Sequence, residues 1–140
     1  MLKSPFENVS LSWEPRLSYI LGGLEVYDRE EDRGEALKKY NPNDIQDRCE
    51  IIKKFVLRDL DYLSYRHRFA LFKVLEMALI DKGFDFSAQF ESDYDECSTI
   101  VWDETEIEDA RGFFEEIYRL AGEEWREDLN KARLEDQSTW

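Results

Sequence analysis

One uninterrupted acidic stretch limits what this chain can fold into. Residues 84–109 contain ten carboxylates and no Lys or Arg, which contributes −10 of the formal net charge of −14 and leaves −4 for the rest of the chain. The carboxylates must remain in water, whereas the large apolar residues among them favour burial. These apolar residues are Phe84, Phe86, Phe90, Tyr94, Ile100, Val101 and Trp102. Disordered acidic tails are poor in such groups, so we predict an ordered, negatively charged surface beside a core.

Two amphipathic helices are predicted before this acidic stretch. Asn43 is the expected cap of the first helix, and its apolar residues recur at spacings of 4, 3, 4 and 4. They are Ile45, Cys49, Ile52, Val56 and Leu60. The second helix is predicted over residues 65–82, with Ser64 as its cap and Gly83 as a left-handed residue that ends it.

A long C-terminal helix is predicted to begin at Asp109. Its apolar stripe consists of Phe113, Ile117, Leu120, Ala121, Trp125, Leu129 and Ala132. Residues 14–27 carry a further helical pattern, which Gly22 and Gly23 either end or weaken.

A small β element completes the expected fold. Residues 98–102 are rich in β-branched and aromatic side chains, and acidic residues bound them on both sides. We therefore predict one α+β, mainly α domain over residues 1–140, with helices packed around a small β element near residues 98–102.

Composition limits the compartment and the partner. The acidic charge favours a basic protein partner and disfavours direct binding of nucleic acid. The N-terminus lacks the apolar core of a secretory signal, and no run approaches the ~18 apolar residues of a membrane span, so we expect a cytoplasmic protein without membrane contact. Cys49 and Cys97 have no metal-ligand or redox spacing. Two free thiols are the expectation, and a single disulfide stays open.

Candidate metal and catalytic residues have simpler structural explanations. Clustered acids at Asp93, Asp95 and Glu96 suit Ca²⁺ or Mg²⁺, but a calcium loop counted from Asp93 has Ser98 where its glycine is required. His67 is the single histidine, so we expect a partly exposed structural role for it. The glycines match no phosphate-binding loop. We predict no enzymatic activity, no cofactor and no metal site.

The acidic stretch is instead predicted to be a docking surface. Its carboxylates would pair with Lys or Arg of a partner, while Tyr94 and Trp102 would supply aromatic anchors. The predicted partner-binding residues are Asp93, Tyr94, Asp95, Glu96, Trp102, Asp103, Glu104 and Glu106. Two alternatives are that Trp102 completes the core and that the acids only maintain solubility.

Three segments carry a resemblance to a known class of protein: ESDYDE (Glu91–Glu96), WDETEIED (Trp102–Asp109) and ARGFFEEIYRLAGEEW (Ala110–Trp125). In size, charge and mixing of acids with aromatics, the chain resembles the small acidic immunity proteins that bacteria co-produce with nuclease or other polymorphic toxins, including those of contact-dependent growth inhibition. The resemblance implies a cytoplasmic antitoxin that binds a basic toxin and covers its active or nucleic-acid-binding surface.

Three other functions stay open for the same acidic charge. They are a phage-type nucleic-acid mimic that inhibits restriction or CRISPR enzymes, a carboxylate metal-binding enzyme, and a structural or adaptor module.

Overall fold

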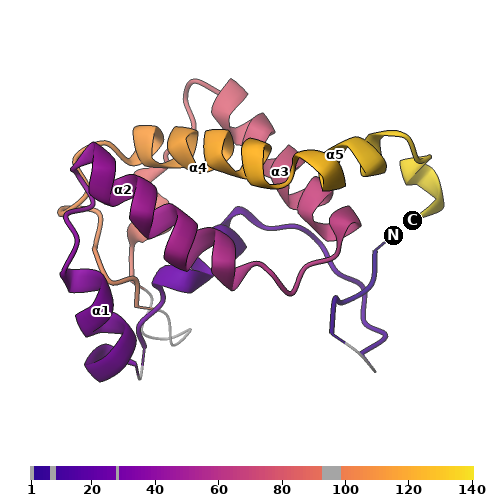
Figure 1. Cartoon of the computed structure of the whole chain (residues 1–140). Coiled ribbons are helices and arrows are strands. Elements are labelled where there is room, and N and C mark those ends of the chain that lie inside the picture. Colours follow the sequence, from indigo (N-terminus) through magenta and orange to yellow (C-terminus); the bar gives the residue numbers. More distant parts are fainter. Residues whose placement is uncertain (1, 7–8, 28, 93–98) are drawn as a thin grey trace.

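The computed structural model describes residues 2–6, 9–27, 29–92 and 99–140, and it is mainly helical (Figure 1). The α-helices are α1 (Glu35–Lys38), α2 (Ile45–Ile51), α3 (Tyr65–Ile80), α4 (Ala110–Glu124) and α5 (Arg126–Arg133). The segments η1 (Leu17–Leu24), η4 (Ser87–Phe90) and η5 (Gln137–Thr139) are 3₁₀-helices, and η2 (Glu30–Gly34) and η3 (Ile52–Leu57) are π-helices. No helix in these ranges is long and apolar enough to cross a membrane.

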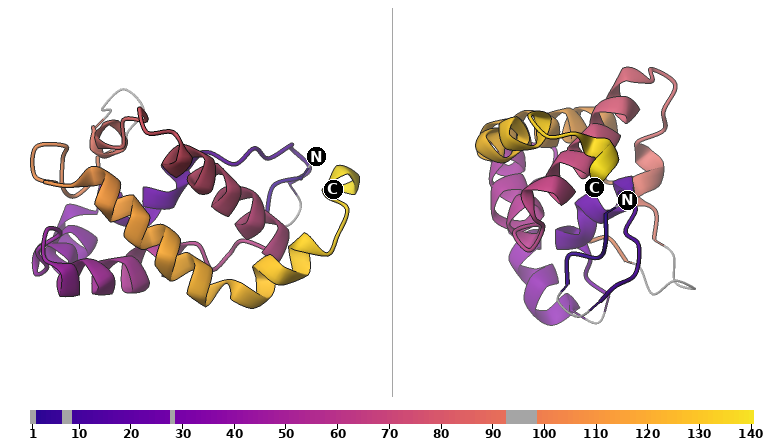
Figure 2. Two further views of the ribbon diagram at one scale, coloured as in Figure 1. Left: turned by 90° about the horizontal axis from the view of Figure 1, so that it is seen from above. Right: turned by 90° about the vertical axis from the view of Figure 1, so that its right-hand side faces the viewer.

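The predicted C-terminal helix exists, but it is bent. Asp109 accepts a hydrogen bond from the Gly112 amide and caps α4, as its predicted position requires. All seven residues of the predicted apolar stripe are buried. At Trp125, where φ is −97° and ψ is 14°, the rod bends into α5 (Figure 2). The bent rod packs against α3 along α4 and α5, and against η3 through α4.

The helix that was predicted to follow Asn43 differs from the prediction at its start. Asp44, rather than Asn43, caps α2 by accepting a bond of 2.9 Å from the Asp47 amide. Ile52, Val56 and Leu60 are buried as predicted, and Cys49 is a half-buried free thiol. Ile45, which was predicted to belong to the same apolar stripe, is instead 77% exposed at the first position of α2.

Gly23 permits a close contact between η1 and η3. A Cβ atom at this position would lie 1.9 Å from the Phe55 carbonyl oxygen, so no larger residue fits. Arg33 fastens the same region, because its Nη1 donates to the Gly23 carbonyl at 3.2 Å and lies 3.6 Å from Asp59 Oδ1. Of the two alternatives for residues 14–27, the structure has the short helix that ends near the glycines, because η1 spans Leu17–Leu24 and ends one residue after Gly23.

The end of α3 also differs from the prediction. Ser64 caps the helix as expected, but α3 ends at Ile80, and Gly83 is not left-handed. Arg111 of α4 explains why no left-handed residue is needed. Its guanidinium donates to the Leu79 carbonyl at 3.1 Å and to the Asp81 carbonyl at 2.8 Å, which satisfies the end of the helix.

The predicted β element near residues 98–102 is not formed among the described residues. Ile100 makes one isolated antiparallel bridge with Glu25, and Lys3 makes another with Ser12. Residue 98 lies outside the described ranges. The segment that Ile100 meets directly follows η1, so the helix turns away and leaves no strand along which a ladder could continue.

Candidate docking surface

The loop formed by residues 99–109 is anchored at both ends by buried side chains. Trp102 and Ile107 are each 5% exposed. Backbone bonds join the start of the loop to the end of η1, from the Val26 amide to Thr99 at 2.8 Å and from the Val101 amide to Leu24 at 3.0 Å. This half of the acidic stretch is therefore ordered, as the sequence predicts.

Asn43 holds the far end of the loop against the start of α2. Its Nδ2 donates to the Glu106 carbonyl at 2.9 Å, and its Oδ1 accepts from the Glu108 amide at 3.0 Å. The side-chain amide of Asn43 thus makes both hydrogen bonds to backbone groups that are more than 60 residues away in the sequence. These two bonds hold the loop beside the start of α2.

Asp103 closes a tight turn inside the loop. Its Oδ1 accepts from the Thr105 hydroxyl at 2.5 Å and from the Thr105 and Glu106 amides at 2.9 and 3.2 Å. The hydroxyl bond, followed by the Thr105 amide bond, holds the pKa of the Asp103 carboxyl below its usual value. Asp85 makes the same kind of turn with Ser87, and Asp109 caps α4. Part of the acidic charge therefore serves local structure.

Three other carboxylates of the loop point into solvent: Glu104, Glu106 and Glu108, which we call the acidic loop face. Glu104 and Glu108 make no side-chain hydrogen bond in the described part of the chain, and Glu106 accepts only from the Asp103 amide at 3.2 Å. None of the three lies within 4.0 Å of a described Lys or Arg nitrogen. Like charges held on a short loop without counter-ions repel one another.

The structure places the predicted docking residues in different environments. Glu104 and Glu106 are exposed as predicted, and Asp103 is half-buried in its turn. Trp102 belongs to the core, so it cannot serve as an exposed anchor, and the alternative interpretation is correct. The other four predicted residues lie outside the described ranges: Asp93, Tyr94, Asp95 and Glu96. Cys97 lies there too.

His67 is buried, at 8% exposure, rather than partly exposed as predicted. Its Nε2–H donates to the Lys3 carbonyl at 2.6 Å, because a carbonyl can only accept. Its Nδ1 therefore accepts from the Ser64 hydroxyl, also at 2.6 Å, and Trp13 packs edge-on against the ring. The imidazole thus ties the N-terminal segment to the start of α3.

Neither possible metal-binding groups nor comparisons with known proteins identify a function for this surface. In the described ranges, no three His, Cys, Asp or Glu side chains are grouped so that they could hold a metal ion. Comparisons with protein-family models, curated proteins and solved structures return no match to this chain.

Proposed function

We propose that this chain is a cytoplasmic inhibitor of the immunity-protein type, which neutralises a basic partner by binding it through the acidic loop face. A nuclease-type toxin is the partner class that the sequence resemblance implies. The observation that carries the proposal is that, among the described residues, Glu104, Glu106 and Glu108 have no ion-pair partner on an anchored loop. Unpaired surface carboxylates accelerate encounter with a cationic protein and select it over neutral ones.

The anchoring of the loop supports a binding role over a purely solubilising one. Solubility needs charge but no fixed geometry. Here Trp102, Ile107 and Asn43 hold the backbone in place, so the points from which the carboxylate side chains extend are fixed. Asp44 and Asp109, which are exposed caps of α2 and α4, extend the negative potential on either side.

Charge reversal at the acidic loop face tests the proposal. The partner is first sought by co-purification with the product of the neighbouring gene, and association is then followed by stopped flow at several salt concentrations. Glu104→Lys combined with Glu108→Lys should slow association by about tenfold or more at low salt and reduce its salt dependence. Neither side chain bonds to a residue that the structure describes, so stability should change little.

The matched control is Glu14→Lys combined with Glu127→Lys, which changes the net charge equally at exposed positions outside the loop. This control should slow association much less. Equal slowing by both variants would mean that only net charge matters, which contradicts a defined docking face. Competition with DNA for several unrelated DNA-binding proteins would instead indicate a nucleic-acid mimic.

A further inference from the structure

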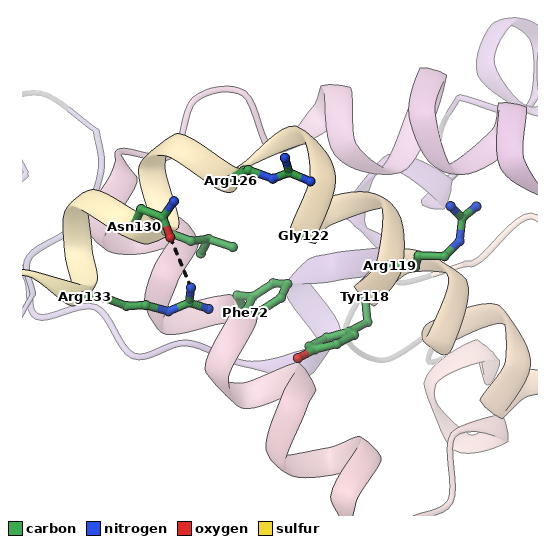
Figure 3. A pocket seen from close by; sticks show the side chains of 8 residues that line it. Phe72, Tyr118, Arg119, Gly122, Arg126, Asn130 and Arg133 are labelled. Carbon is green, nitrogen blue, oxygen red and sulfur yellow. Dashed lines mark hydrogen bonds between the residues drawn. The ribbon is translucent and has the colours of Figure 1, made fainter.

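A second surface has the opposite character to the acidic loop face. A groove of about 400 Å³ lies where α4 and α5 meet α3 (Figure 3). It is lined by Phe72, Tyr118, Arg119, Gly122, Arg126, Leu129, Asn130 and Arg133. Three of these eight residues are arginines, although acids outnumber bases by 33 to 19 in the whole chain. Such a local excess of positive charge needs an explanation.

Aromatic and aliphatic groups form the floor of this groove. Phe72 stacks on Tyr118, with ring centroids 4.6 Å apart and an interplanar angle of 19°, and Leu129 is buried beside them. The Tyr118 hydroxyl donates to Glu76 Oε2 at 3.0 Å, which fixes the orientation of its ring. Gly122 has no side chain to cover Phe72, since even a Cβ would be 3.7 Å from Phe72 Cζ. Phe72 and Leu129 are themselves buried, at 5% and 3% exposure, so the apolar surface that the floor offers to a ligand is mainly the half-buried Tyr118 ring.

The arginines form the rim, and they differ in how much of their charge is already neutralised. Arg119, Arg126 and Arg133 are seven residues apart, so one edge of the rod carries all three. Arg119 pairs with Glu116 and also with Glu123, at 3.2 Å. In the described part of the chain, neither Arg126 nor Arg133 has a carboxylate within 4.0 Å, and Arg133 donates only to Asn130 Oδ1 at 3.3 Å.

Two unneutralised guanidinium groups beside an apolar floor select a particular ligand chemistry. Guanidinium groups bind carboxylates with paired hydrogen bonds, and an aromatic floor accepts an apolar side chain. Arg126 also lines an adjoining hollow, together with Arg68 and four carboxylates: Glu123, Glu124, Glu127 and Asp128. These carboxylates would repel a long polyanion such as nucleic acid that continued past the groove, whereas a short ligand can end before them. We propose that this groove binds a short acidic peptide segment of a partner protein, with carboxylates on Arg126 and Arg133 and one apolar side chain on Phe72 and Tyr118.

This peptide site does not rest on the proposed function, because it uses other residues and a ligand of opposite charge. The probe is a fluorescein-labelled peptide with two Asp residues on each side of a single Phe, and binding is read by fluorescence anisotropy on the full chain. Saturable binding that weakens with added salt is expected. A peptide with Ser in place of Phe should bind at least about fivefold more weakly, because it leaves the apolar floor exposed.

The contributions of the two arginines and of the apolar floor to peptide binding are tested with separate variants. Arg126→Gln combined with Arg133→Gln should weaken binding by at least about tenfold, because charge-assisted hydrogen bonds are lost. The matched control, Arg16→Gln combined with Arg29→Gln, removes two exposed arginines outside the groove and should stay within about twofold. Gly122→Leu should also weaken binding by covering Phe72, and circular dichroism on each variant confirms that it remains folded.

Several results would overturn the peptide site. These are the absence of saturable binding by the unaltered chain, unchanged affinity in the Arg126 and Arg133 double variant, and equal affinity of the Phe and Ser peptides. Tighter binding of a single-stranded oligonucleotide that also requires these arginines would assign the groove to nucleic acid. Self-association of the chain in analytical ultracentrifugation, abolished by the double variant, would assign it to a second copy.

Discussion

Of all the single glycine-to-alanine replacements in this chain, Gly23→Ala should destabilise the fold most. The new Cβ would lie 1.9 Å from the Phe55 carbonyl oxygen, whereas ordinary contact begins near 3.4 Å, so η1 and η3 would have to separate by about 1.5 Å. A gap of 0.5–1 Å already forfeits a quarter to a half of a contact's dispersion energy. Because this contact involves backbone, we expect a loss of about 3–5 kcal/mol in the free energy of unfolding.

The neighbouring glycine supplies the control. At Gly22 a Cβ would meet only the carboxylate end of Asp59, at 3.0 Å, and that side chain can rotate. Gly22→Ala should therefore change stability by no more than about 1 kcal/mol. For 140 residues the entropy of unfolding is about 0.3 kcal/mol/K, so Gly23→Ala should lower Tm by about 10 °C or more. Urea and thermal unfolding of both variants measure this, and similar losses for the two would refute the steric argument.

Two further predictions concern the loop and the C-terminal segment. Asn43→Ala should lower the free energy of unfolding in urea by about 1–2 kcal/mol, because two backbone groups of the loop lose their hydrogen bonds. The same variant should speed hydrogen exchange at the Glu108 amide. Unchanged exchange would contradict the role of Asn43 in holding the loop. Glu135 has its pKa lowered chiefly by the Tyr65 hydroxyl bond and then by Arg66. A lowered folded pKa gives stability that is present above the unfolded value of about 4.3 and is lost as pH falls through the folded value. Glu135→Gln should therefore flatten the loss of stability below about pH 4.3, and parallel acid-unfolding curves would count against it.

The sequence predicts the helices whose burial follows a simple period. The stripe along α4 and α5 is correct from Phe113 to Ala132, because one face of the rod stays against the core for its full length. The bend at Trp125 is not predictable in this way, since no proline marks it and Gly122, three residues earlier, continues α4 without interruption. The π-helical geometry of η3 is also missed, because its apolar residues follow an ordinary helical spacing.

Two differences from the sequence prediction, at Gly83 and at the expected β element, share one cause. The pattern at Gly83 is typical of a left-handed helix end, but Arg111 already binds the last carbonyls of α3. The β-branched residues near Ile100 are typical of a strand, but the partner segment near Glu25 is only the end of a helix. In both cases a distant segment supplies the hydrogen bonds, and local propensity cannot identify it.

The sequence predicts the negative charge of the candidate site, but only in part the hydrogen bonds that hold its loop in place. The exposure of Glu104 and Glu106 follows from the density of acids alone. The turn at Asp103 had a readable signal, because an Asp followed two residues later by Ser or Thr often bonds back to its own turn. Asn43 carried no such signal, since the backbone it binds is more than 60 residues away. The only sequence signal of the groove arginines was that Arg119, Arg126 and Arg133 are spaced seven residues apart.

The hydrogen bonds of Asn43 also bear on affinity. Fixing one backbone residue costs about 1–2 kcal/mol of conformational entropy, whether folding or binding imposes the order. Asn43 makes the loop at Glu106 and Glu108 meet that cost during folding, so a partner would find it preorganised. A residue that need not touch the partner would then set how tightly the partner is held.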